Sequence, residues 1–113
     1  MVTKLTRADL QARIAGGRPI LVEALGSTYF EDAHLPGAIN IPHEQVDELA
    51  PELLPDRSAE IVVYCASTTC RNSEIAARRL EQLGYTNVAE YVDGKADWIE
   101  ASLPVESGVV ASL

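Results

Sequence analysis

Cysteine is scarce in this chain of 113 residues, which holds only Cys65 and Cys70. Two cysteines cannot form a disulfide framework, and in a reducing compartment both are expected to be free thiols. Long apolar runs are missing too, because no stretch approaches the ~20 residues that cross a bilayer. Residues 1–10 lack the continuous apolar segment of a signal peptide. We therefore expect a cytoplasmic protein that does not enter membranes.

Positive charge is limited as well. Lys and Arg number 9 against 17 for Asp and Glu, so the formal net charge is −8. An acidic surface repels phosphate backbones and anionic lipids, so neither nucleic acid nor a membrane is an expected partner. A hydrophobic share of 47% suits an ordinary globular core. The length predicts one domain over residues 1–113, with a core from about 5 to 106 and a frayed tail at 107–113.

Short apolar segments alternate with amphipathic ones along the chain. We predict strands at 20–22, 61–64 and 88–92 and a short extended piece at 38–39. Helices are predicted over 6–14, 44–53, 73–83 and 95–101, with a short helix or turn near 26–32. Asn72 or Ser73 is expected to cap the third of these helices. Strands that alternate with helices predict an α/β fold with a mainly parallel sheet.

Cys65 is the first candidate for chemistry, because it directly follows the clearest predicted strand. Ligands of open α/β sheets bind beyond the carboxyl ends of the strands. The loop after Cys65 leads into a predicted helix, whose first N–H groups lack partners and carry partial positive charge. Such surroundings stabilise a thiolate, so we expect the pKa of Cys65 to be lowered. The same groups would attract an anionic substrate.

The segment after Cys65 is the candidate substrate-binding loop. Its residues are small and polar up to Arg71, whose forked guanidinium adds donors for an anion. The predicted loop residues are Ala66, Ser67, Thr68, Thr69, Cys70 and Arg71. The alternative is that Cys65 is only a small hydrophobic residue at a strand end. Cys70 is either an inert loop thiol or a resolving thiol that forms a disulfide or exchanges sulfur with Cys65.

Other chemistry-bearing residues have simpler interpretations. His34 is expected to hydrogen-bond within its turn, His43 to be exposed and Trp98 to lie in the core. Two scattered histidines and two cysteines do not match a metal-ligand spacing, and no glycine-rich phosphate loop is present. The acidic residues between 44 and 52 are expected to form a solvated helix face. Neither a metal nor an organic cofactor is predicted.

Five segments, in order, resemble the rhodanese-homology family over residues 5 to 106. They are His34–Pro42, Val62–Cys65, Ala76–Ala77, Leu83–Val88 and Gly94–Glu106. The resemblance implies a five-stranded, mainly parallel sheet with helices on both faces. It also implies a sulfurtransferase that needs no cofactor. In that chemistry the Cys65 thiolate takes the outer sulfur of thiosulfate or a similar anionic donor. The resulting persulfide then passes sulfur to cyanide, a cellular thiol or a sulfur-relay protein.

Three features depart from the family pattern. Glu23 stands where the family usually has Asp at the end of its second strand, and the Arg that follows there is missing. The loop from Cys65 to the helix start is about two residues longer than usual and contains no glycine. Cys70 lies inside that loop. The departures leave the implied fold intact and leave the substrate open.

Two other functions compete with sulfur transfer. Cys65 to Arg71 matches Cys-x5-Arg, the pattern of cysteine-dependent phosphatases. Cell-cycle dual-specificity phosphatases and some arsenate reductases share the rhodanese fold and use a lengthened loop to hold a tetrahedral oxyanion. No general-acid Asp follows closely here. The third function is that of a non-catalytic binding or sulfur-relay module, although such members typically lose the nucleophile that Cys65 retains.

Overall fold

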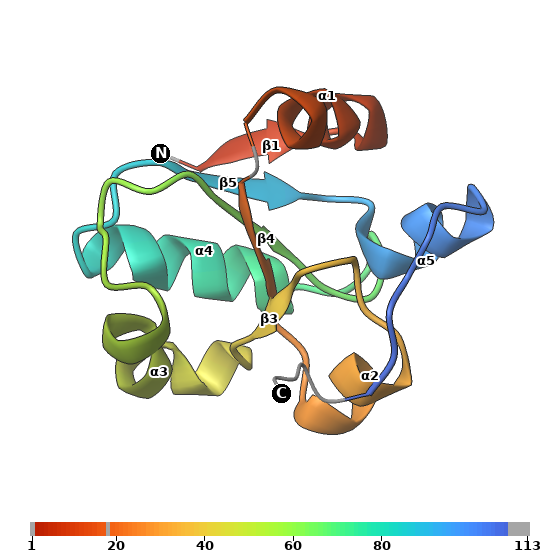
Figure 1. The fold of residues 1–113 in the computed structure, drawn as a ribbon. Helices are drawn as coiled ribbons and strands as arrows, with labels where there is room; N and C mark the ends of the chain where they lie inside the picture. Colours follow the sequence, from red (N-terminus) through yellow and green to blue (C-terminus); the bar gives the residue numbers. More distant parts are fainter. Residues whose placement is uncertain (1, 18, 109–113) are drawn as a thin grey trace.

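A computed structural model describes residues 2–17 and 19–108 of the chain. One parallel sheet of five strands runs through the molecule in the order β1-β5-β4-β2-β3 (Figure 1). The strands are β1 (Thr3–Leu5), β2 (Ile20–Glu23), β3 (Ile39–Asn40), β4 (Ile61–Tyr64) and β5 (Val88–Tyr91). All neighbouring strands are parallel, which confirms the predicted α/β architecture.

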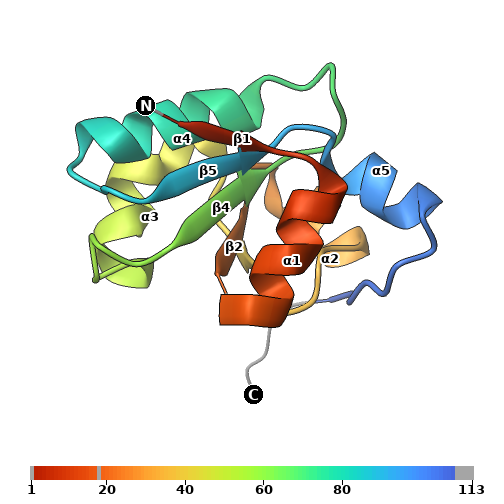
Figure 2. The same cartoon turned by 90° about the horizontal axis from the view of Figure 1, so that it is seen from above.

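Helices cover both faces of this sheet (Figure 2). They are α1 (Arg7–Gly17), α2 (Ser27–Asp32), α3 (Val46–Leu53), α4 (Asn72–Gln82) and α5 (Gly94–Glu100), with a 3-10 turn η1 at His43–Gln45. Val22, Val63 and Val88 pack in the core that α3 and α4 complete. Leu21, Val62 and Ala89 point to the opposite face, which α1, α2 and α5 cover. Because alternate residues of a strand face opposite sides, both faces of the sheet are buried.

Three local predictions need correction. The strand β1 was not predicted, because its three residues are mostly exposed and hold one buried side chain, Leu5. Helix α1 continues through Gly17 rather than ending at residue 14. Helix α4 is preceded by Arg71 at its N-cap, with no side-chain cap, so neither Asn72 nor Ser73 serves as the predicted cap. The Ser73 hydroxyl makes other hydrogen bonds instead.

The two histidines differ from each other. His34 is buried, its Nδ1 hydrogen-bonds the Phe30 carbonyl at 2.7 Å, and its ring stacks on the Phe30 ring. The ring is therefore hydrogen-bonded, but its partner lies in α2 rather than within the predicted turn. His43 is half-buried rather than exposed, and its Nδ1 has no hydrogen-bond partner among the described residues.

The end of the described chain is attached to α2. The Ser107 hydroxyl donates to the Asp32 carbonyl at 3.1 Å, and the Gly108 amide donates to the Glu31 carbonyl at 2.6 Å. Ser107 and Gly108, the first two residues of the predicted tail, thus have hydrogen bonds to α2. Residues 109–113 lie outside the described part.

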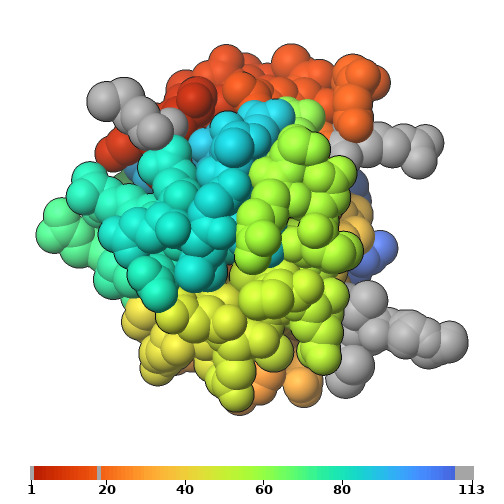
Figure 3. Space-filling model, turned by 90° about the vertical axis from the view of Figure 1, so that its left-hand side faces the viewer, coloured from red at the N-terminus to blue at the C-terminus, as the bar shows by residue number. Residues whose placement is uncertain are grey.

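The two ends of the sheet differ in what surrounds them. At the amino end of β4 and β5, the segments 54–60 and 83–87 pack beside α3 and α4 (Figure 3). At the carboxyl end, the loop after β4 approaches the start of α5 (Figure 1). Cys65 therefore lies at the end of the sheet where the sequence placed its candidate chemistry.

A buried ion pair joins α5 to β2. The Lys95 Nζ donates to Glu23 Oε2 at 2.9 Å, and the Glu23 side chain is fully buried. Lys95 also donates to the carbonyls of Tyr29 and Ala33 at 2.9 and 2.6 Å, which satisfies its three protons. Glu23 stands where the resembling family usually has Asp. In this chain the cation that pairs with its carboxylate is Lys95 of α5.

Tyr64 extends the same network to β4. Its hydroxyl donates to Glu23 Oε1 at 2.8 Å and accepts from the Leu35 amide at 3.1 Å. Burial and the neighbouring Glu23 carboxylate raise the pKa of Tyr64 far above its ordinary value. The phenol therefore stays a neutral donor, and β2, β4, α2 and α5 meet in one hydrogen-bonded cluster.

Replacing Lys95 with Met should destabilise the protein strongly. The substitution keeps the length of the side chain but leaves the Glu23 carboxylate buried without its cation. Breaking a buried pair in this way costs about 3–5 kcal/mol of unfolding free energy. Urea denaturation of the wild type and of Lys95→Met measures this difference.

Two controls accompany that prediction. The double variant Glu23→Gln with Lys95→Met removes both charges and should recover much of the loss. Arg13→Met breaks the Arg13–Glu60 pair, whose side chains are 33% and 29% exposed, and should cost far less. Equal losses in Lys95→Met and Arg13→Met would contradict the structural importance given to the buried pair.

Candidate active site

Cys65 is held at the carboxyl end of β4 with only 1% of its surface exposed. It points to the same side of the sheet as Val63, toward α4, because residues two apart on a strand share a face. Its Sγ lies 3.3 Å from the Cys70 carbonyl oxygen and 3.2 Å from the Ser73 hydroxyl. The sulfur is therefore enclosed between its own loop and the first turn of α4.

The loop backbone is fixed on its other side by α5. The amides of Lys95 and Ala96 donate to the carbonyls of Cys65 and Ala66, both at 2.8 Å. In a trans peptide the N–H points away from the C=O, so the next amides in the loop turn away from α5. Within the described residues, the N–H groups of residues 66–69 have no hydrogen-bond partner. Such a run of free donors suits an anion.

Gly94 makes this close approach of α5 and the loop feasible. Its φ is +73°, and a Cβ there would lie 2.7 Å from the Cys65 carbonyl oxygen and 2.8 Å from the Ser67 amide nitrogen. No other residue fits without moving the loop, since both nearest atoms are backbone. The glycine that the family resemblance identified is thus explained by contact with the candidate loop.

The pKa of Cys65 is raised, which corrects the prediction that it would be lowered. Burial is the largest cause, because it removes water from the thiolate, and the Cys70 carbonyl adds to it by accepting the S–H. Ser73 acts in the opposite direction but does not offset the burial. The Ser73 backbone N–H at the helix start does lower the pKa, but burial and the Cys70 carbonyl outweigh it.

Ser73 and Glu90 complete the surroundings of the sulfur. The Ser73 hydroxyl donates to Glu90 Oε2 at 2.7 Å, and both residues are at most 5% exposed. Sequence reasoning missed both. For Glu90 a signal existed, because it is the only charged residue within the predicted apolar strand at 88–92. For Ser73 no signal existed beyond its position near a helix start.

The other predicted loop residues are placed as follows. The Ser67 hydroxyl lies 3.1 Å from the Thr69 hydroxyl, and the Cys70 amide donates to the Ser67 carbonyl, so residues 67–70 form a turn. Cys70 is half-buried and, like Cys65, a free thiol. Arg71 does not reach the sulfur, because its side chain is 80% exposed and its Nε lies 3.8 Å from Glu74.

A hollow of about 390 Å³ opens beside the loop. Lys4 and Arg71 contribute positive charge to its lining, and Glu74 and Glu90 contribute negative charge. The other flank of the loop is acidic, since Asp93, Asp97 and Glu100 line a smaller hollow beside Ser67 and Thr68. An anion would therefore approach Cys65 from the side of Lys4 and Arg71.

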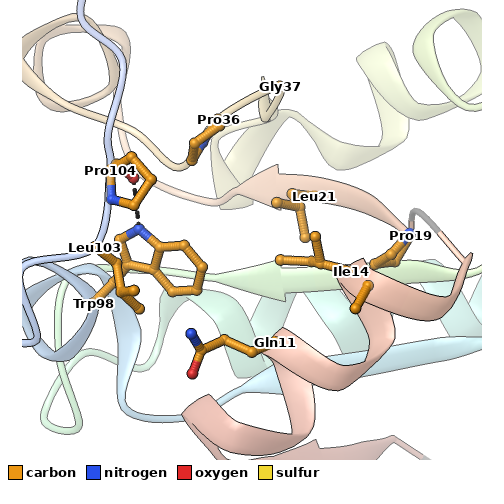
Figure 4. A pocket seen from close by; sticks show the side chains of 10 residues that line it. Gln11, Ile14, Pro19, Leu21, Pro36, Gly37, Trp98, Leu103 and Pro104 are labelled. Carbon is orange, nitrogen blue, oxygen red and sulfur yellow. Dashed lines mark hydrogen bonds between the residues drawn. The ribbon is translucent and has the colours of Figure 1, made fainter.

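An apolar cavity of about 620 Å³ lies elsewhere, between α1, β2 and α5 (Figure 4). Trp98 forms one wall, and its indole N–H donates to the Pro104 carbonyl at 2.8 Å. Ile14 and Leu21 form the opposite side, and Gln11 is the one polar side chain in the lining. None of the lining residues belongs to the loop at 65–71, so this cavity is separate from the candidate chemistry.

The described residues hold no group of three His, Cys, Asp or Glu side chains arranged for a metal ion. Among them, no helix has the length and apolar character needed to cross a membrane.

Comparison with known proteins agrees with this geometry. The sequence profile of the rhodanese-like domain family matches residues 6–101. The HTH-type transcriptional regulator Rv0324 of Mycobacterium tuberculosis is 36% identical over 104 residues, which is 92% of this chain and 45% of that protein. Thiosulfate sulfurtransferase PspE of Escherichia coli is 37% identical over 59 residues, covering 52% of this chain and 55% of that protein.

A solved structure gives the same result for the fold. Thiosulfate sulfurtransferase from Pseudomonas aeruginosa superposes with a TM-score of 0.81 and 26% identity over 96% of this chain and 20% of that one. The chain belongs to the rhodanese-like domain family, and sulfurtransferases are among its relatives. It spans about half the length of the two curated relatives it is compared with.

Gly94→Ala should displace the loop and uncover Cys65. The positive φ alone costs about 1–2 kcal/mol for a residue with a Cβ, and the backbone contacts force further movement. We expect lower stability and faster alkylation of Cys65 by iodoacetamide, measured by urea denaturation and site-resolved mass spectrometry. Gly26→Ala is the matched control, since nothing lies within 4 Å of a Cβ at that position. If the two variants alkylate alike, Gly94 does not position the loop.

Proposed function

We propose that the chain is a sulfurtransferase that carries sulfane sulfur on Cys65. One observation carries the proposal: a cysteine at the carboxyl end of the central strand, enclosed by a loop with four free N–H groups. A thiol in that position is a nucleophile, and the free donors suit the anionic sulfur that it would carry. The sulfurtransferases among the relatives support the same chemistry.

The reaction follows from the positions of these groups. Cys65 Sγ attacks the outer sulfur of thiosulfate or a similar donor, an S–S bond forms, and sulfite leaves with the electron pair of the bond that breaks. The persulfide then rests inside the loop, where the N–H groups of residues 66–69 stabilise its charge. A thiolate or cyanide acceptor takes the outer sulfur and returns Cys65 to its starting state. Because Cys65 is 1% exposed, the loop has to move for both partners to reach it.

The acceptor is proposed as a cellular thiol, free or on a relay protein. Acidic side chains surround one flank of the loop, while Lys4 and Arg71 lie on the other. Small anions and thiolates would enter from the second flank. No metal or organic cofactor has a part in this scheme.

Replacing Cys65 with Ser should abolish sulfur transfer. A serine hydroxyl is a poor nucleophile toward sulfane sulfur and cannot form a persulfide. Thiocyanate production from thiosulfate and cyanide measures this, and circular dichroism shows whether the variant folds. Full activity in a folded Cys65→Ser variant would overturn the proposal.

Arg71→Ala separates sulfur transfer from phosphatase or arsenate reductase chemistry. The exposed guanidinium points to Glu74 rather than to the sulfur, so we expect sulfur transfer to fall less than about tenfold. An enzyme that clamps a tetrahedral oxyanion with this Arg would lose nearly all activity, by about 10²–10³ or more. Arg78→Ala is the matched control, because Arg78 is also exposed and also pairs with Glu74.

Hydrolysis of an aryl phosphate that needs both Cys65 and Arg71 would favour the phosphatase instead. A protein with neither activity, whose partner binding survives Cys65→Ser, would be a binding module.

A further inference from the structure

Cys65, Ser73 and Glu90 form a chain of buried polar groups that the proposed reaction has not yet used. The distances along it are 3.2 Å from Cys65 Sγ to Ser73 Oγ and 2.7 Å from Ser73 Oγ to Glu90 Oε2. Their residues are 1%, 1% and 5% exposed. The chain crosses from the loop through α4 to β5, so three separate elements bring it together.

The single proton of the Ser73 hydroxyl gives this chain a direction. A carboxylate can only accept a hydrogen bond, so the Ser73 hydroxyl donates its proton to Glu90 in this short contact. The remaining lone pairs of Ser73 Oγ then lie 3.2 Å from Cys65 Sγ, and the S–H can turn to them from the Cys70 carbonyl, to which it donates at 3.3 Å. The sulfur proton therefore has an acceptor whose own proton is already shared with a carboxylate.

A proton acceptor is needed at this cysteine. The thiol is buried, and the Cys70 carbonyl beside it favours the protonated form. Among the described residues, the sulfur has hydrogen-bond contacts with Cys70 and Ser73 and none with a cationic side chain: Lys95 is bound to Glu23 on the other face of the sheet, and Arg71 is exposed to solvent. Attack on a sulfur donor at neutral pH therefore requires that the S–H lose its proton to a nearby base.

We propose that Glu90, acting through the Ser73 hydroxyl, accepts the Cys65 proton during attack on the sulfur donor; this rests on the sulfur transfer proposed above. As the bond between Sγ and the donor sulfur forms, the S–H bond breaks and its proton moves to Ser73 Oγ. The Ser73 proton moves at the same time to Glu90 Oε2. Net charge within the buried chain is conserved, because one negative charge moves from the carboxylate to the sulfur that reacts.

The second half of the cycle uses the same path in reverse. When a thiolate or cyanide acceptor removes the outer sulfur, Cys65 Sγ leaves with the electron pair of the broken bond. Ser73 returns a proton to Sγ and regains one from Glu90. Ser73 touches the reacting sulfur, whereas Glu90 is a positioning and proton-holding residue that acts through Ser73.

Other titratable groups also face this chain. Lys4 lies on β1, where it pairs in register with Glu90. Those that line the same hollows from α4 and the loop are Glu74, Arg78, Glu81, Cys70 and Arg71. Lys4, Glu74, Cys70, Arg71 and Arg78 have no side-chain hydrogen bond to Ser73 within the described residues, whereas Glu90 is joined to Cys65 through the Ser73 hydroxyl.

The pH profile of Cys65 alkylation by iodoacetamide tests the proposal without a sulfur donor. With the relay, the rate should have a pH-independent shelf through neutral pH, and the further rise that marks the free thiolate should come above the ordinary thiol pKa of about 8.5, because the pKa of Cys65 is raised. Glu90→Gln keeps the shape and an acceptor for Ser73 but cannot take the proton. It should lose the shelf, react at least about tenfold more slowly at pH 7, and match the wild type at high pH. Site-resolved mass spectrometry separates Cys65 from Cys70.

Two further variants complete the test. Ser73→Ala breaks the chain while Glu90 remains, and it should lose the shelf as well. Glu74→Gln removes a nearby negative charge that is not joined to Ser73, and it should keep the shelf. A merely electrostatic Glu90 would have the opposite sign, because removal of its charge favours the thiolate and speeds alkylation at pH 7. Faster or unchanged alkylation in Glu90→Gln overturns the relay.

The test also distinguishes this proposal from the one on which it rests. A shelf that depends on Glu90 in a protein that never gains sulfur from donors would establish the relay and reject sulfur transfer. Sulfur transfer whose rate is unchanged in Glu90→Gln and Ser73→Ala would support the sulfurtransferase and reject the relay.

Discussion

The buried contact between Lys95 and Glu23 is the constraint on which the site depends. It fixes the first turn of α5 against the carboxyl end of β2. That turn also supplies the two amides that hold the carbonyls of Cys65 and Ala66, and the glycine that lets the backbones approach. The position of the loop therefore follows from an ion pair on the opposite face of the sheet from the cysteine.

Two structural elements hold the reactive loop from opposite sides. Helix α5 binds its carbonyls, and the first turn of α4 brings Ser73 beside the sulfur. This enclosure raises the pKa of the resting thiol, because burial removes water from the charged form. A buried cysteine of this kind depends on a base at the moment of attack rather than on a preformed thiolate. Glu90 lies where that base is required.

Much of the fold could be predicted because its signals are local. The run of four apolar residues at 61–64 predicts the central strand, and the position of Cys65 right after it predicts the candidate site. The short strand β1 could not be predicted, because it owes its structure to pairing with β5 across the chain. The same is true of the Lys95–Glu23 pair, whose members are 72 residues apart.

The candidate site was predicted in outline and missed in its chemistry. The sequence predicted the loop, but it also predicted that the start of the following helix would lower the pKa of Cys65. That prediction took no account of burial, which is the largest cause of the raised pKa, or of the Cys70 carbonyl oxygen, which accepts the S–H at 3.3 Å. Arg71 likewise fits the Cys-x5-Arg spacing but projects into solvent toward Glu74. Spacing alone does not give side-chain direction.

Intact-mass spectrometry after brief incubation with thiosulfate and desalting tests the central claim most directly. The account predicts that the wild-type protein gains the mass of one sulfur atom, that Cys65→Ser gains none, and that a thiol reductant removes the added mass. A folded wild-type protein that gains no sulfur while Cys65 remains alkylatable would contradict the claim that thiosulfate loads this cysteine. A gain that persists in Cys65→Ser would show that another residue carries the sulfur.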